Sequence, residues 1–371
     1  MCRSMLNACA AGTLLLWTFL LACSGTGQVI DQRSVYARPA PATYTSHARV
    51  APKTLEVSRA IGSENTFGML FIITALDDKL LVIDRTPLVG SERLLVVDRS
   101  TGLVERRAAP YGQGPGDVQT VLSIAPVPDR ANTFSVYDYM NKRFTFFELD
   151  PWGGPVDYVV HSDGVQTLNA AWLGGGRVVM NGTSADHLLR FYTVDESGDA
   201  LRFERKVGSS VFPSVPPRAQ RLLNYNKLAV RPDRKVLVVA FTFANRLYFF
   251  DSDGNLLRTI AGPVEVLTRH FEDGRLDIAG GAQVAYLDVD ATTDHVYALF
   301  GDGDVQLGEG TTIHVFTWNG DLVEIYRLGR PINFLTVAED SRSIFGVTNE
   351  PFPQIVEFAV SSGFPAEPVR R

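Results

Sequence analysis

Residues 228–260 read LAVRPDRKVLVVAFTFANRLYFFDSDGNLLRTI, and this stretch decides the fold. It contains four short runs rich in aliphatic and aromatic residues, at 228–230, 236–240, 246–250 and 256–260. Asp, Gly, Asn and Pro residues separate the runs, and these are the residues that favour turns. Four short strands joined by such turns predict one antiparallel sheet.

The same pattern recurs along the chain. Residues 123–160, SIAPVPDRANTFSVYDYMNKRFTFFELDPWGGPVDYVV, form a second clear copy, and the period is about 45 residues. Six copies are recognisable, at 71–108, 121–161, 167–207, 227–261, 285–328 and from 333 onward. Four-strand repeats of this length are typical of propeller blades. We therefore predict an all-β, six-bladed β-propeller with four-stranded antiparallel blades over residues 51–362.

The two ends of the repeat region are expected to pair. The sixth copy lacks its outermost strand, and a β-rich run at 55–59 (LEVSR) precedes the first copy. An N-terminal strand that completes the last blade closes the ring and removes exposed sheet edges. Two connections are longer than a turn, at 208–226 and 262–283, and residues 264–271 predict a short helix in the second.

The composition indicates a globular protein, with 45% hydrophobic and 20% charged residues. The net charge is -6 and no long basic block occurs, so we expect no nucleic-acid partner, since such binding needs clustered Lys and Arg. The Gly-x-Ser-x-Gly motif and the helical zinc-protease motifs are absent from the sequence. We assign no catalytic residues.

The N-terminus predicts export. Arg3 precedes an apolar run at 8–22, which is shorter than the roughly 20 residues needed to span a bilayer. The run ends in LLACSG, which resembles the bacterial lipoprotein signal. Residues 1–22 are therefore predicted to be a signal peptide and Cys23 the lipidated residue. The alternative is an ordinary signal peptide or a short anchor.

The flanking segments read as unstructured. Residues 23–50 are rich in Ala, Pro, Ser, Thr and Gly and predict a flexible tether, and 363–371 predict a C-terminal tail. Ser24 after the cysteine favours the outer membrane if the host is Gram-negative. We expect a protein that is lipid-anchored to the cell envelope. The mature chain keeps only Cys23, which excludes a disulfide framework.

The alternation of strand direction places a candidate ligand face. The turns between second and third strands open on the same face as the connections into the next blade. Polar residues that follow second strands or lie in the first inter-blade connection are therefore expected around one end of the central channel. These candidates are Gln113, Asp117, Asp84, Asp138, Asn181 and Asn349.

The connection YGQGPGD (111–117) is followed by a strand and then by SVYDYMNKRFTFF (135–147). A strand that ends in Asp, then a turn with Asn and Arg, resembles the bacterial six-bladed propeller lipoproteins of the TolB-like or NHL-like group. This resemblance implies a binding or scaffold role, because most members of the group have no assigned reaction. Asp138 and Arg143 are expected to form a structural ion pair across the turn.

One acidic loop is a candidate metal site. Asp302, Asp304 and Glu309 supply hard oxygen ligands in a Gly-rich segment, which suits calcium. The loop lacks the remaining ligands of an EF-hand, and acidic turns are common on surfaces. Calcium is the one cofactor that the sequence suggests.

Three functions are consistent with these patterns. The leading hypothesis is a lipid-anchored envelope propeller that binds a protein, a glycan or a small ligand. The alternative is a calcium-dependent lactonase- or lyase-like enzyme with its site at the channel mouth, by analogy of fold. The third is a purely structural envelope component. The membrane, reached through the lipid anchor, is the one partner that the sequence names.

Overall fold

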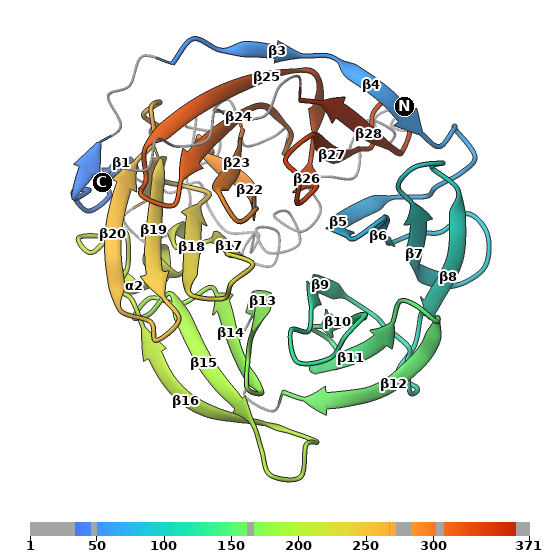
Figure 1. Ribbon diagram of the computed structural model, residues 1–371. Coiled ribbons are helices and arrows are strands. Elements are labelled where there is room, and N and C mark those ends of the chain that lie inside the picture. The colour runs from blue at the N-terminus through green and yellow to red at the C-terminus, as the bar shows by residue number, and fades with distance from the viewer. Residues whose placement is uncertain are drawn as a thin grey trace, which may run out of the picture.

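The computed structural model describes residues 34–45, 50–161, 167–266, 268–271, 283–301 and 308–360. Six sheets stand around a central axis, and the first strand of each lies nearest that axis (Figure 1). The chain is a six-bladed β-propeller, as the repeat predicts. Within these ranges, none of the helices combines the length and the apolar character needed to cross a membrane.

Each blade uses consecutive strands, ordered from the axis to the rim. Blade one consists of β5(Leu70–Leu76), β6(Lys79–Asp84), β7(Glu92–Asp98) and β8(Val104–Pro110). Blade two consists of β9(Val121–Pro126), β10(Thr133–Asp138), β11(Arg143–Glu148) and β12(Gly153–Val160). Blade three consists of β13(Thr167–Gly174), β14(Arg177–Gly182), β15(Leu189–Val194) and β16(Leu201–Val207). Blades four and five are β17(Asn226–Val230), β18(Val236–Phe241), β19(Arg246–Asp251) and β20(Leu256–Ala261); β22(Tyr286–Ala291), β23(His295–Phe300), β24(Gly310–Thr317) and β25(Leu322–Ile332).

The sixth blade confirms the predicted closure. It consists of β26(Phe334–Val337), β27(Ser343–Thr348) and β28(Gln354–Ala359), with β4(Val57–Ile61) as its outermost strand. β4 runs antiparallel to β28, with Ile61 opposite Ile355 and Ala60 opposite Val356. In Figure 1, β3(Lys53–Leu55) and β4 run along the outside of blades five and six.

The chain before β4 pairs more extensively than the sequence indicates. β3(Lys53–Leu55) adds in parallel to β25, and β2(Tyr44–Thr45) adds in parallel to β20. β1(Ser34–Ala37) pairs with β21(Thr268–Phe271). Part of the segment expected to be a tether is therefore held against the propeller.

The long connections also differ from expectation. The predicted helix over residues 264–271 is wrong, because 268–271 form β21. The connection between blades three and four instead contains the helix α2(Pro217–Leu223), which begins with proline at its first position. Proline is favoured there because its missing amide hydrogen and fixed φ cost nothing in the first turn.

The core lies between the blades. Middle strands are covered on both faces by neighbouring sheets, so their apolar runs are continuous, as in β18, where the residues from Leu237 to Phe241 are all buried. Trp172 of blade three packs against Phe144 and Phe146 of blade two, with ring centroids 5.4 Å apart in both pairs. Its indole nitrogen donates to Ser135 Oγ at 2.8 Å. These contacts hold blade three against blade two.

Candidate functional site

Asp84 and Asp138 lie at the ends of second strands, as expected, but their carboxylates are buried and occupied by backbone amides. Asp84 accepts hydrogen bonds from the amides of Gly68 at 2.9 Å and Met69 at 3.0 Å. These two donors lie in the connection that enters blade one. The carboxylate therefore joins the entry of the blade to its second turn.

Asp138 does the same one blade later. Its oxygens accept from the amides of Thr120 at 3.1 Å and Met140 at 3.0 Å, and from the Asn141 side chain at 2.9 Å. The amide of Gln119 is a further donor. A buried carboxylate needs several donors to offset its lost hydration, and these amides supply them. This geometry favours a structural role.

The two asparagines of the predicted face link innermost strands. Asn181 accepts from the amide of Asn169 at 2.6 Å and donates to the carbonyl of Asn226 at 2.9 Å. Asn349 both accepts from the amide and donates to the carbonyl of Leu70, at 3.0 Å in each case. Their polar atoms satisfy strand edges that would otherwise be unpaired.

Arg143 holds the backbone of the Gly-rich connection at 111–117 in place. Arg143 Nη2 donates to the carbonyl of Asp117 at 2.8 Å and to that of Gly114. The expected ion pair between Asp138 and Arg143 is therefore replaced by bonds from each side chain to backbone. The Asp117 carboxylate accepts from the Gly114 amide at 2.9 Å, and Gln113 is exposed. Of the six predicted face residues, Gln113 is the most accessible to a partner.

The candidate calcium loop is described only in part. Asp302 and Asp304 lie outside the described residues, and Glu309 is half-buried. Burial, and the nearby Glu350, raise the pKa of Glu309 above its ordinary value. Among the residues that the structure describes, no three His, Cys, Asp or Glu side chains are grouped so that they could hold a metal.

A Ser-Asp-His group occurs beside blade three, but its geometry is not that of a nucleophile and base. The Oγ of Ser184 and the Oδ1 of Asp186 both lie at Nδ1 of His187, at 3.0 and 2.7 Å. His187 Nε2 accepts from Arg190 Nε at 2.6 Å. Serine and carboxylate therefore meet the same ring nitrogen, whereas a catalytic triad uses both nitrogens.

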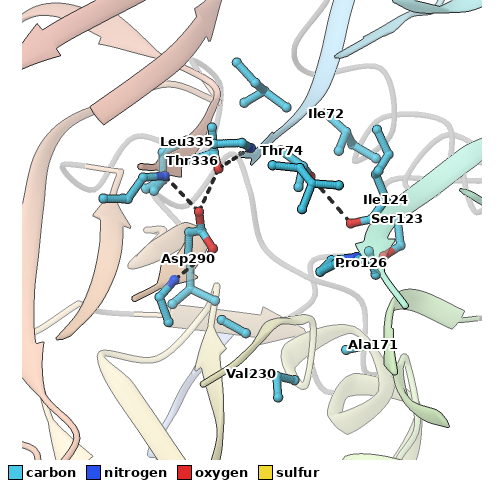
Figure 2. Close-up of a pocket in the computed structure, with 18 of the residues that line it drawn as sticks. Ile72, Thr74, Ser123, Ile124, Pro126, Ala171, Val230, Asp290, Leu335 and Thr336 are labelled. Atoms are coloured by element: carbon cyan, nitrogen blue, oxygen red, sulfur yellow. Dashed lines mark hydrogen bonds between the residues drawn. The ribbon is translucent and has the colours of Figure 1, made fainter. Parts of the chain in front are cut away.

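The central channel holds a cavity whose lining residues the sequence did not identify. It is a cavity of about 690 Å³, bounded by the innermost strands β5, β9, β13, β17, β22 and β26 (Figure 2). Pockets that hold small molecules span about 300–1,000 Å³. One end of the cavity is lined by residues of the hairpins that follow the first strands, including Arg234 and Asp340. This is the face opposite the predicted one.

Side chains from one blade satisfy the exposed backbone of the next around the channel. Asp288 Oδ2 accepts from the amide of Leu335 at 3.0 Å. Asp290 Oδ2 accepts from the amide of Val337 at 2.9 Å and from the Thr336 hydroxyl at 2.8 Å (Figure 2). The innermost strands have no further strand to pair with, so these bonds complete them.

The channel contains unbalanced charges. Burial raises the pKa of Asp288 to about 6, and the positive charge of Lys227 opposes that rise. Burial also raises the pKa of Asp290. The Lys227 ammonium lies 5.0 Å from the centre of the Phe334 ring, which in turn meets Phe71 edge-on at 4.7 Å.

A sequence signal for these residues existed. β22 reads YLDVDA, so acidic residues alternate with apolar ones in a strand that its apolar neighbours mark as buried. An innermost strand with charges at alternate positions indicates groups directed at the channel. Nothing in the sequence gives their distance from Lys227, because the two strands belong to different repeats.

No protein-family model matches this chain. No curated protein matches it either. Solved structures do match: a protein of Bacteroides fragilis named "Putative exported protein" shares 13% identity, with 86% of this chain and 99% of that chain covered and a TM-score of 0.55.

Two further structures have lower scores. The β-propeller domain of Cps50 (Swd1) from Myceliophteria thermophila shares 11% identity, covering 83% and 100% of the two chains, with a TM-score of 0.48. U3-55K shares 11% identity, covering 84% and 100%, with a TM-score of 0.44. Identities this low show a shared fold alone. The Bacteroides fragilis structure, with its TM-score of 0.55, is the comparison that supports the fold described above.

Proposed function

We propose that this chain is a lipid-anchored binding module of the cell envelope, and that its central channel is the ligand site. The observation that carries the proposal is a cavity of about 690 Å³ whose walls hold Lys227, Asp288 and Asp290. Charged side chains in the middle of a ring are costly unless a partner offsets them. A propeller that served only as a scaffold would be more stable if apolar side chains lined or filled its central channel.

The anchor is proposed from the sequence. The apolar run that ends at Cys23, and the resemblance to TolB-like and NHL-like lipoproteins, support export and lipidation at that cysteine. The comparison with the Bacteroides fragilis protein is consistent with export. The outer membrane is the proposed destination in a Gram-negative host. The Cys23→Ala variant should leave the membrane fraction, whereas Cys9→Ala should remain in it.

The enzyme alternative has less support. A calcium-dependent lactonase or lyase needs carboxylate and amide ligands converging at the channel mouth. Asp84, Asp138, Asn181 and Asn349 instead use their polar atoms on backbone groups. A partner protein or glycan at the rim, where Gln113 is exposed, is the second candidate.

The test compares two ligands of the propeller. The small-molecule fraction of an envelope extract is added to the purified chain, and the melting temperature is followed with and without calcium. A channel binder is stabilised by the extract, and Lys227→Met abolishes that effect. Lys206→Met on the outer strand β16 is the control. Stoichiometric calcium that raises the melting temperature, with no effect of the extract, would favour the enzyme.

A further inference from the structure

Three polar groups face the channel from neighbouring blades with incomplete bonding. The first is the Lys227 ammonium on β17, which makes no hydrogen bond or ion pair with any residue that the structure describes. The ammonium lies over the face of Phe334, 5.0 Å from the ring centre. A cation over an aromatic ring is stabilised only modestly, so a nearby anion would add substantially.

The second group is the carboxylate of Asp288 on β22. One of its oxygens accepts from the Leu335 amide at 3.0 Å. Lys227 attracts it, yet these two described side chains do not form an ion pair with each other. Burial without sufficient donors explains why the pKa of this carboxyl rises to about 6.

The third group is Asn169 on β13. Its side-chain nitrogen donates to the carbonyl of Leu122 at 3.4 Å, whereas its side-chain oxygen is buried and has no hydrogen-bond partner. Asn181 links it to the next blade, because Asn181 bonds both to the Asn169 amide and to the carbonyl of Asn226, the neighbour of Lys227. The side-chain oxygen of Asn169 is therefore an unsatisfied acceptor that is covered within the wall of the channel.

The arrangement has the complementarity of a ligand with two opposite charges. A simple anion would satisfy Lys227 but would be repelled by Asp288 and Asp290. A neutral sugar would leave both kinds of charge unpaired. A molecule with a carboxylate and an ammonium group offsets both.

The cavity also has an apolar wall, although charged residues such as Arg234, Glu339 and Asp340 line one of its ends. Ile72, Ile124, Ala171 and Val230 border the same space (Figure 2). These side chains offer a surface for an aliphatic group of the ligand, and about 690 Å³ is enough for two or three amino-acid residues. We infer that the channel binds a small zwitterion, namely a free amino acid or a short peptide with an apolar side chain, its carboxylate on Lys227 and its ammonium on Asp288. This inference rests on the proposed function.

The test uses isothermal titration of the full chain in detergent with leucine and Leu-Leu. N-acetyl-leucine, leucinamide and glucose are the matched probes, since they lack the ammonium, the carboxylate or both. At least one zwitterion should bind at least 10-fold more tightly than every matched probe. Lys227→Met should reduce that preference at least 10-fold, while Lys227→Arg should retain most of it. Asp288→Asn should remove the discrimination between Leu-Leu and its N-acetyl form.

Two results would overturn the inference in different ways. If glucose or N-acetyl-leucine binds as tightly as Leu-Leu, and Lys227→Met still weakens it, the zwitterion is wrong and the channel site stands. If the panel and the envelope extract all fail to bind, or bind equally to Lys227→Met and Lys206→Met, the channel is not the ligand site. Each variant is first shown to keep the cooperative thermal transition of the parent.

Discussion

The hydroxyl of Ser58 donates a hydrogen bond of 3.0 Å to the carbonyl oxygen of Glu357, a residue 299 positions later in the chain. The next residue, Arg59, forms an ion pair of 2.8 Å with the Glu357 side chain. Both contacts belong to the antiparallel pair of β4 and β28. The ring is therefore closed by β4, the strand directly before blade one, and the stability of the fold depends on contacts between the two ends of the propeller.

Removing β4 should open the ring. A chain that begins at Gly62 loses the buried Ile61 and exposes the edge of β28. We expect its melting temperature to fall by roughly 10 °C or more, with association through the free edge. A chain that begins at Val50 keeps β3 and β4 and should remain a cooperative monomer. Calorimetry and size-exclusion chromatography measure both. An open-ended chain as stable and monomeric as the longer one would contradict the role of β4.

Asp138 should act on stability and not on ligand binding. Asp138→Ala leaves the amides of Thr120 and Met140 without the buried carboxylate that accepts from them, so we expect a loss of about 3 kcal/mol in the free energy of unfolding. Gln113→Ala, exposed on the same face, should change it by less than about 0.5 kcal/mol. Urea unfolding gives both values. If the two variants lowered the free energy of unfolding equally, or if folded Asp138→Ala bound ligand with altered affinity, Asp138 would be a binding residue and not a structural one.

The bond between Trp172 and Ser135 should couple two blades. Ser135→Ala leaves the buried indole N–H without an acceptor, at a cost of about 1–3 kcal/mol. Trp172→Phe removes the donor and part of the packing on Phe144. The double variant should therefore be more stable than the sum of the two changes predicts, by about 1 kcal/mol. Strict additivity in urea unfolding would show that the bond contributes nothing between the blades.

The sequence predicts what is repeated and local. The runs that become β18 and β19 are buried on both faces and are continuous in the sequence, so their strands are predictable. Closure by β4 follows from counting, since one blade lacks a strand. β1 and β21 are four residues each, and their pairing depends on a contact between distant parts of the chain that no local pattern records.

The site illustrates the other limit. Asp84 and Asp138 attract attention because acidic residues at strand ends are common in binding sites, but burial among amides explains them without a ligand. Lys227 and Asp288 come from separate repeats, and only the ring places them on one cavity. Whether a polar group lacks a hydrogen-bond partner depends on distances between atoms in the folded chain, and the sequence does not give those distances.

The charge of Asp288 should make stability depend on pH. Its pKa is about 6 in the folded protein, above the value of about 3.9 expected for an unfolded chain, so folding favours the neutral form. Below pH of about 4 the group is neutral in both states and costs nothing. Above pH 6 it is ionised in both, and the folded state bears the full penalty. The free energy of unfolding should therefore decrease through this window as the pH rises, by up to about 3 kcal/mol.

Asp288→Asn removes that titration and keeps an oxygen for the Leu335 amide. The advantage of the variant over the parent should be about 2–3 kcal/mol larger at pH 7.5 than at pH 4, when both are unfolded with urea and no ligand is present. Hydrogen bonds and ion pairs hold the pKa values of Asp98 and Asp186 below their ordinary range, so those groups lose stability on acidification. They do so equally in both proteins and cancel in the comparison. A difference that stays constant with pH would mean that Asp288 is ionised without penalty, and that its charge is already balanced in the free channel.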